Sequence, residues 1–237
     1  MTELLYQTDA MLRVFDATVV ASEGERVELD RTAFYPTGGG QPHDLGWFDL
    51  GSERRAVTRV EREGEKVWHT VPGPPLAAGT VVRGSLDWER RHQLMRTHTA
   101  LHVLSAIIWR DYGAPVTGGG MEPLRGRLDF ELGALPADFA ARLEAAIAAE
   151  IRAARPVEVR LLPRDEALRI PDLIRTKVNL LPADIRIIRT VHIMGLDLQA
   201  DGGTHVGNSS EIGAVRVVEV KSKGKNFRRV RLEIVDG

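Results

Sequence analysis

The stretch DWERRHQLMRTHTALHVLSAIIWR, residues 87–110, decides how the chain is organised. Its large apolar residues recur at the three- and four-residue spacing of an α-helix that buries one side. They are Leu94, Leu101, Leu104 and Ile108. The period changes from strand-like to helical near Asp87. The sequence therefore predicts a long helix here and a domain boundary near residue 87.

Upstream of this helix, short alternating runs such as RVELD (26–30) and ERRAVTRVE (53–61) predict strands. Turn sequences separate them, among them EGE at 23–25 and PGPP at 72–75. Many short strands with frequent turns are typical of a small barrel. We expect a β-barrel domain over residues 1–87, with an open sheet as the alternative.

Downstream, a second helix is predicted after Pro136, because the first turn of a helix has no use for the N–H that proline lacks. Strand-like segments follow, namely VEVRLL (157–162), IRIIRTVHI (185–193), AVRVVEV (214–220) and FRRVRLEIV (227–235). The expected fold class is α+β, with the small N-terminal barrel followed by an α+β domain over residues 88–237.

Composition narrows the possible functions. The 237 residues are 43% hydrophobic and 27% charged, as in ordinary soluble proteins. We find neither a signal peptide nor an apolar run near the roughly 20 residues that span a bilayer, so we expect a cytoplasmic protein without a membrane partner. The absence of cysteine excludes disulfides and thiolate catalysis, and it restricts a metal site to His, Asp, Glu or backbone ligands.

Three histidines form a candidate metal site. His98 and His102 are four residues apart on the predicted helix, so their imidazoles are neighbours on one face and can share a metal ion. His205 follows Gly202 and Gly203 in DGGTHVGNSSEIG (201–213), where the glycines permit a sharp turn. A distant third imidazole added to a helical pair is the usual arrangement of a catalytic zinc site. The alternatives are two half-exposed helical histidines and a third that caps a turn.

Taken together, these motifs resemble a known family. RTHTALHVL and DGGTHVGNSSEIG resemble the paired metal-binding motifs of the editing domain of alanyl-tRNA synthetases and of the free-standing alanyl-tRNA editing proteins of the AlaX type. TAFYPTGGGQPHDLG (32–46) resembles the glycine-rich segment of their N-terminal barrel, and KSKGKNFRRVRLEI resembles the closing strands of the editing domain. The resemblance covers nearly the whole chain and fits the medium-length AlaX form best. It implies an editing domain like the second additional domain of threonyl- and alanyl-tRNA synthetases.

The resemblance implies one Zn²⁺ per chain, held by His98, His102 and His205. Asp201 stands where the family commonly has a cysteine, which is a departure from the pattern. Either its carboxylate is the fourth ligand, or a water completes the site and Asp201 orients a ligand or that water. We expect the second arrangement, with Asp201 contributing to catalysis.

The implied activity is deacylation of mischarged tRNA(Ala), a hydrolysis of the ester between an amino acid and the 3′ adenosine. Serine is the expected amino acid and glycine a possible second one. Thr117, in APVTGGG, matches a threonine that contacts the serine hydroxyl in smaller family members. A site built to bond a hydroxyl rejects the analogue that lacks it. The alternative is that Thr117 only begins a glycine turn.

Two further groups are candidate contacts to the substrate. Gly39, Gly40 and Gln41, in the glycine-rich segment, are expected to border the pocket; a plain hairpin loop is the alternative. Basic residues just before the first metal ligand and near the C-terminus are candidate RNA phosphate contacts, although charge runs are more often solvated. They are Arg90, Arg91, Lys221, Lys223, Lys225 and Arg228.

Three other functions remain open on the sequence. They are a zinc hydrolase of small esters or amides, a non-catalytic tRNA-binding module with a structural zinc, and editing of a different mischarged tRNA, against which the GGGQ segment favours the alanine system. A monomer and a homodimer fit the sequence equally well.

Overall fold

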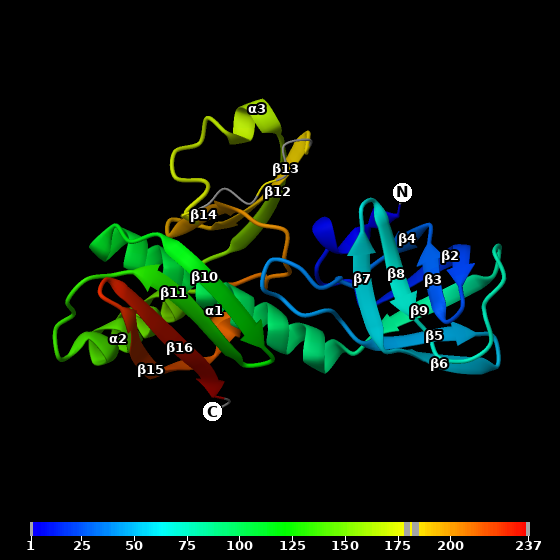
Figure 1. Cartoon of the computed structure of the whole chain (residues 1–237), viewed down its shortest axis with the longest axis horizontal. Coiled ribbons are helices and arrows are strands. Elements are labelled where there is room, and N and C mark those ends of the chain that lie inside the picture. Colours follow the sequence, from blue (N-terminus) through cyan, green and yellow to red (C-terminus); the bar gives the residue numbers. More distant parts are fainter. Residues whose placement is uncertain (1, 178–180, 182–184, 236–237) are drawn as a thin grey trace. The chain divides into compact units, whose positions relative to one another are not determined.

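The computed structural model describes residues 2–177, 181 and 185–235. The chain divides into two compact units, Met1–Gln93 and Leu94–Gly237. The expected long helix is α1, Trp88–Tyr112, which begins in the first unit and continues into the second (Figure 1). Its predicted apolar side is buried, since Leu94, Leu104 and Ile108 have no exposed surface and Leu101 is 5% exposed. The prediction for this stretch is confirmed.

The first unit is made of strands, as the alternating runs predicted. Its elements are β1 (Glu3–Leu4), the 3₁₀ turn η1 (Leu5–Gln7), β2 (Val14–Glu23), β3 (Arg26–Leu29), β4 (Arg31–Thr32), β5 (Gly46–Leu50), β6 (Glu53–Val57), β7 (Arg59–Glu63), β8 (Lys66–Thr70) and β9 (Val81–Leu86). Seven of these strands form one antiparallel sheet in the order β6-β5-β9-β2-β3-β8-β7. The core of the unit contains Phe34 and Phe48, whose rings meet edge to face 5.8 Å apart.

The two end strands of this sheet, β6 and β7, are consecutive in the sequence and only Thr58 separates them. The sheet therefore curls until its ends approach one another. Among the described residues, no hydrogen-bonded ladder joins β6 to β7. A curled sheet is thus established, whereas the closed barrel expected from the sequence is not confirmed.

The second unit mixes helices and strands, as expected. After α1 come β10 (Val116–Glu122), β11 (Arg125–Glu131), α2 (Phe139–Arg152), β12 (Val157–Pro163), α3 (Arg164–Ala167), β13 (Ile187–Ile193), β14 (Asp197–Ala200), the 3₁₀ turn η2 (Ser209–Ile212), β15 (Ala214–Gly224) and β16 (Phe227–Val235). They form a four-stranded sheet, β10-β11-β16-β15, and a three-stranded sheet, β12-β13-β14. The predicted second helix and the four predicted strands correspond to α2, β12, β13, β15 and β16.

Helix α1 packs closely against the four-stranded sheet, and α2 packs beside β15 and η2 (Figure 1). A Cβ atom added at Gly126 of β11 would lie 2.9 Å from Cδ2 of Leu101, closer than packed carbon atoms tolerate. Glycine at this position therefore lets α1 approach the sheet closely. No described helix is long and apolar enough to cross a membrane.

Candidate metal centre

The three candidate histidines meet in the second unit. His98 and His102 project from consecutive turns of α1, and His205 comes from the loop that follows β14. The ring centroid of His205 lies 4.3 Å from that of His98 and 4.7 Å from that of His102. All three residues are less than 9% exposed. The alternative of two half-exposed helical histidines is therefore excluded.

Asp201 lies among the three imidazoles. Its Oδ1 is 3.5 Å from Nε2 of His98 and 3.9 Å from Nε2 of His102, and its Oδ2 is 3.1 Å from Nε2 of His205. One donor atom from each of the four residues can be chosen so that all lie within 4.8 Å of one another. The donors of a tetrahedral zinc ion, each about 2.0–2.2 Å from the metal, lie roughly 3.3 Å apart. Asp201 is therefore close enough to be a fourth donor, and its outer position, expected from the sequence, stays a prediction.

The glycine turn positions Asp201. Oδ2 of Asp201 accepts the N–H of Gly203 at 2.7 Å, so the side chain folds back on its own loop. The backbone of Asp201 is tied to β13, because its N–H donates to the carbonyl of Arg189 and its carbonyl accepts from Nη1 of Arg189. The DGGTH sequence thus forms a turn that holds the carboxylate and His205 on the same side.

Two buried neighbours orient the histidine rings. Thr99 donates its hydroxyl proton to the carbonyl of Met95 at 2.9 Å, so its oxygen accepts the Nδ1 proton of His205 at 3.1 Å. Oδ2 of Asp197, a buried residue, lies 3.0 Å from Nδ1 of His102. Both contacts place the ring proton on Nδ1 and leave the lone pair of Nε2 facing the cluster, as metal-binding histidines require.

Three of the four groups in the cluster are in the charge state that a bound cation requires. Burial lowers the pKa of His98 to about 4 and the pKa of His205 well below its ordinary value. Burial acts to raise the pKa of Asp201, but the nearby histidines outweigh it and hold that pKa well below the usual range. For His102, burial lowers the pKa, yet the hydrogen bond to Asp197 prevails and the pKa is raised.

These donors fit Zn²⁺. Neutral imidazoles and an ionised carboxylate are the ligands that zinc accepts in a chain without cysteine. His98, His102 and His205 would hold the ion with Asp201 as a fourth donor. Asp197 and Thr99 would support the rings from behind. The sequence did not reveal these two residues, because nothing in it shows that an aspartate four positions before Asp201, or the threonine beside His98, turns toward a ring nitrogen.

The role of Asp201 can be tested with Asp201→Asn. An amide is a much weaker zinc ligand than a carboxylate, and the change removes the negative charge among three imidazoles. We therefore expect the variant to lose most of its zinc during dialysis, measured by atomic absorption after gel filtration. If the variant retains one zinc per chain, Asp201 is not a ligand and instead orients a ligand or a water molecule.

Thr117 is exposed on β10, at the bulge between Val116 and Gly118. Its neighbour Val116 donates to the carbonyl of Arg175, and Nη1 of Arg175 donates to Asp197 at 2.5 Å. Asp197 in turn holds His102. One chain of contacts therefore joins the strand of Thr117 to the histidine cluster.

The glycine-rich segment lies in the first unit. Gly39 and Gly40 have φ angles of +55° and +86°, which glycine adopts without strain, and they form the tip of a turn closed by two hydrogen bonds between Gly38 and Gln41. Gln41 is only 1% exposed. The segment therefore is a tight turn whose glycines are required by the backbone.

Arg91 was expected to contact RNA, and the structure corrects this. Its guanidinium is fully buried in an ion pair with Asp44 and also donates to the carbonyls of Ala10 and Ala33. A side chain with all its donors facing the core is not available to phosphate. Arg90, by contrast, is half-buried and donates to the carbonyl of His43.

The C-terminal candidates are on the surface. Lys221, Lys223 and Lys225 are exposed, and within the described part of the chain none has a carboxylate within 4.0 Å. Arg228 is half-buried and donates to Ser222 and to the carbonyl of Gly224.

Comparison with known proteins is consistent with this geometry. The family of the second additional domain of threonyl and alanyl tRNA synthetases matches residues 188–231, and the family of class II (A) tRNA synthetases matches residues 8–90. The AlaX-M alanyl-tRNA editing protein of Saccharolobus solfataricus is 39% identical over 97% of this chain and 98% of its own length.

The chain belongs to the AlaX-M family of alanyl-tRNA editing proteins. Another member, from Methanosarcina barkeri, is 36% identical over the full length of both chains. The alanine–tRNA ligase of Thermoplasma acidophilum is 35% identical over 97% of this AlaX-M chain, which corresponds to 26% of the ligase. The editing-domain match lies within the second unit and includes Asp201 and His205 of the cluster.

Proposed function

We propose that this AlaX-M family member is a zinc-dependent hydrolase that deacylates mischarged tRNA(Ala), chiefly seryl-tRNA(Ala). The observation that carries the proposal is the buried cluster of His98, His102, His205 and Asp201, in which Nε2 of each imidazole lies within 3.9 Å of a carboxylate oxygen of Asp201. Family membership supports the substrate class, since the relatives that match the chain over its full length are alanyl-tRNA editing proteins.

The residues of the cluster would perform separable tasks. The histidines and Asp201 hold the ion, and Asp197 and Thr99 keep the rings in the tautomer that binds it. A bound Zn²⁺ supplies Lewis acidity, which polarises an ester carbonyl and lowers the pKa of water. Since an aminoacyl ester is already electrophilic, the chain itself needs to position the substrate and a water molecule and to exclude competing nucleophiles.

Thr117 would provide the choice of amino acid. We propose that its hydroxyl bonds the hydroxyl of the seryl group, which alanine lacks. Its position on a strand tied to the cluster through Arg175 and Asp197 supports this role.

Thr117→Val tests the assignment, because valine keeps the shape and removes the hydrogen bond. We expect kcat/KM for seryl-tRNA(Ala) to fall roughly 10- to 100-fold, as for loss of one hydrogen bond that leaves the seryl hydroxyl without its partner in the complex. The low rate on alanyl-tRNA(Ala) should stay unchanged. If the variant hydrolyses seryl-tRNA(Ala) and alanyl-tRNA(Ala) each at the wild-type rate, Thr117 does not belong to the specificity site.

The first unit and the basic residues would bind the rest of the tRNA. We propose that Gly39 and Gly40 border the substrate at the tip of their turn, whose closing residue Gln41 is buried, and that Lys221, Lys223 and Lys225, with Arg90 and Arg228, contact phosphates. Exposure supports the lysines most strongly.

The proposed function is tested by incubating the protein with seryl-tRNA(Ala) and alanyl-tRNA(Ala) in parallel and following release of each amino acid. Rapid loss of serine with little loss of alanine is expected. If free aminoacyl esters are hydrolysed as efficiently as the charged tRNA, the protein is a general zinc esterase.

One observation favours a second function. Four protein donors converge in the cluster, and closed four-ligand zinc sites are typically structural. A tRNA-binding module with structural zinc would bind tRNA(Ala) and leave both amino acids attached in the same assay.

A further inference from the structure

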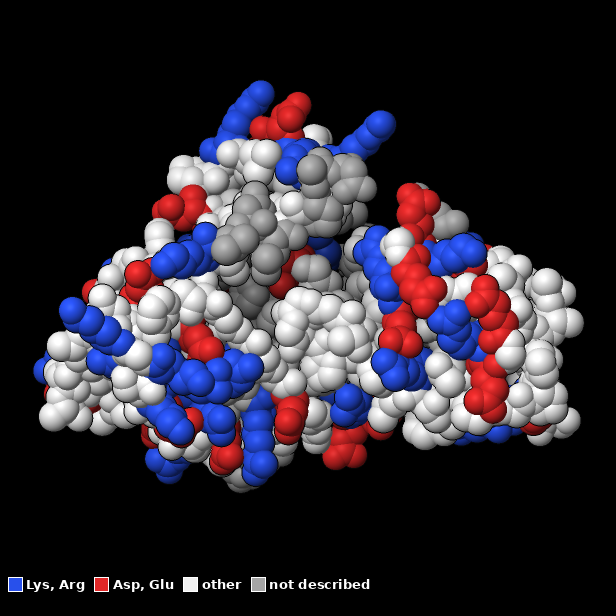
Figure 2. Space-filling view, viewed as in Figure 1, with Lys and Arg blue, Asp and Glu red and all other residues white. Residues whose placement is uncertain are grey.

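The outer face of the four-stranded sheet of the second unit is rich in arginine and lysine. In β11 and β16 alternate residues are buried, namely Gly126, Leu128 and Phe130 in one strand and Val230, Leu232 and Ile234 in the other. The remaining positions point away from α1. We call their basic members and the neighbouring lysines the arginine face; they are Arg125, Arg127, Arg229, Arg231, Lys221 and Lys223. Figure 2 shows blue side chains gathered over these strands.

Like charges stand directly opposite one another on this face. Arg127 of β11 is paired with Arg231 of β16, and Lys221 of β15 is paired with Arg229. Two like charges at directly opposite positions of an antiparallel pair destabilise the sheet. An anion placed between them would relieve that repulsion.

The carboxylates on the face do not neutralise it. Asp129 is bound by Arg229 through both oxygens, at 2.7 and 2.8 Å, and lies 3.4 Å from Arg127. Glu219 pairs with Arg231 at 3.0 Å. Lys221 and Lys223 lack a carboxylate within 4.0 Å among the described residues. A positive excess therefore remains around Arg127 and the two lysines.

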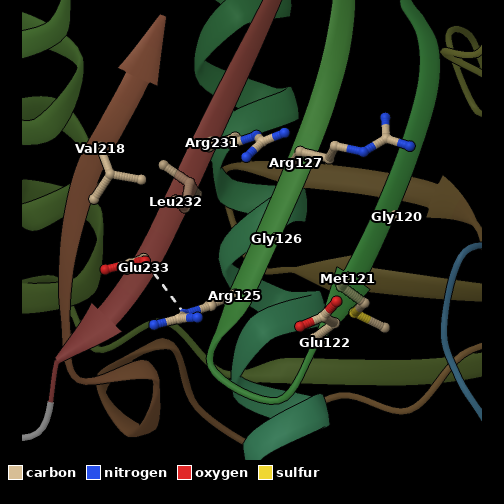
Figure 3. A pocket seen from close by; sticks show the side chains of 10 residues that line it. All are labelled: Gly120, Met121, Glu122, Arg125, Gly126, Arg127, Val218, Arg231, Leu232 and Glu233. Carbon is tan, nitrogen blue, oxygen red and sulfur yellow. Dashed lines mark ion pairs between the residues drawn. The ribbon is translucent and has the colours of Figure 1, made fainter.

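A groove of about 530 Å³ runs along this face between Arg127 and Arg231 (Figure 3). The guanidinium of Arg127 extends over Gly120 of β10, where an added Cβ would lie 3.7 Å from its Nη2. At one end of the groove Arg125 is paired with Glu233 at 3.2 Å. The groove is thus open to solvent and lined by three guanidinium groups and by the carboxylates of Glu122 and Glu233. Guanidinium groups match phosphate oxygens in pairs.

We propose that the arginine face binds the phosphate backbone of the tRNA acceptor stem. The proposal rests on the proposed function, which makes a tRNA the substrate. Charge complementarity favours RNA over an acidic protein segment, because phosphates come at regular intervals and the basic side chains form two successive rows, Arg127 with Arg231 and Arg229 with Lys221. Phosphate contacts position the substrate and carry no sequence information.

The edge of the face leads toward the histidine cluster. Gly118 and Gly120 of β10 present no side chains on this side of the sheet, so a single strand of RNA can lie close to the backbone. The next part of β10, Val116, pairs with Arg175, which contacts Asp197 beside His102. The single-stranded 3′ end of the tRNA would cross this glycine edge on its way from the arginine face to the cluster.

The test is equilibrium binding of uncharged tRNA(Ala) to the full-length protein, measured by filter binding at several salt concentrations. For Arg127→Gln/Arg231→Gln we expect binding at roughly 50 mM salt to weaken about 10- to 100-fold, and the slope of log K against log salt to fall by about 2. Arg142→Gln/Arg152→Gln removes the same charge from the exposed side of α2 and should leave the slope unchanged.

Equal affinity and slope in the two double variants would overturn the proposal. That result would leave the proposed function intact if wild-type protein still deacylates seryl-tRNA(Ala). If the wild type does not deacylate seryl-tRNA(Ala) but the Arg127/Arg231 variant shows the expected loss of tRNA binding, the proposed hydrolase function is overturned and the proposed tRNA-binding face stands. Binding of polyglutamate in place of tRNA, weakened by the same variant, would assign the face to an acidic protein. Thermal unfolding of each variant shows that it is folded.

Discussion

His98→Ala is expected to abolish zinc binding and deacylation together. The variant removes one of three imidazoles whose Nε2 atoms face the centre of a buried cluster. Removal of a residue that only supports a ligand commonly lowers metal affinity or activity 10- to 100-fold, so loss of a ligand should exceed roughly 100-fold in both. Zinc content by atomic absorption and serine release from seryl-tRNA(Ala) measure the two effects on one sample.

His92→Ala is the matched control for this prediction. His92 lies on the same helix, is half-buried, and stacks on Trp88 instead of joining the cluster. It should keep zinc and activity. A His98→Ala protein that is free of metal and still turns over seryl-tRNA(Ala) at the wild-type rate would refute the role of the metal. Because His98 is buried, its replacement could also disturb the fold. Comparing the far-UV circular dichroism spectrum of the variant with that of chelator-treated wild type separates unfolding from loss of the metal.

The second large effect concerns the stability of the first unit. Asp44→Ala is expected to lower the free energy of unfolding by about 3–5 kcal/mol, because it leaves the guanidinium of Arg91 buried without its counter-charge. Asp44 also accepts the N–H of Tyr35 at 2.6 Å, so the change frees a second buried donor. Denaturant unfolding can be followed by tryptophan fluorescence, since Trp47, Trp68 and Trp88 lie in this unit.

Asp49→Ala is the control for Asp44→Ala. Asp49 pairs with Arg54 at 3.4 Å on the surface of the same unit, and its loss should cost at most about 1 kcal/mol. Replacing both buried charges, as in Asp44→Leu/Arg91→Met, should recover part of the stability, because no charge is then left unpaired. If Asp44→Ala lowers the free energy of unfolding no more than Asp49→Ala does, the ion pair between Asp44 and Arg91 does not stabilise the first unit.

The sequence predicted the elements that have strong periodicity. The apolar stripe from Leu94 to Ile108 was sufficient to predict α1, and the four-residue spacing of His98 and His102 was sufficient to place them on one face. The arrival of His205 and Asp201 at the same place depends on β14 and its turn. His205 was expected there from the usual arrangement of a catalytic zinc site, and Asp201 only through the family resemblance.

Side-chain direction was harder to predict. Arg90 and Arg91 were both taken as surface charges, yet neighbouring helical residues point about 100° apart. Arg91 precedes Leu94 and Met95 by three and four residues, so it shares their buried side. That spacing was a usable signal. No comparable signal marked Asp44 as its partner or Asp197 as the partner of His102, because both pairings depend on contacts far apart in the sequence.

The central claim is that the cluster holds a metal that the hydrolysis of seryl-tRNA(Ala) requires. It is tested most directly by following serine release before and after treatment with a chelator, and again after addition of one equivalent of Zn²⁺. The account predicts that the chelator stops serine release and that zinc restores it. Serine release at an unchanged rate from protein shown to contain no metal would contradict it.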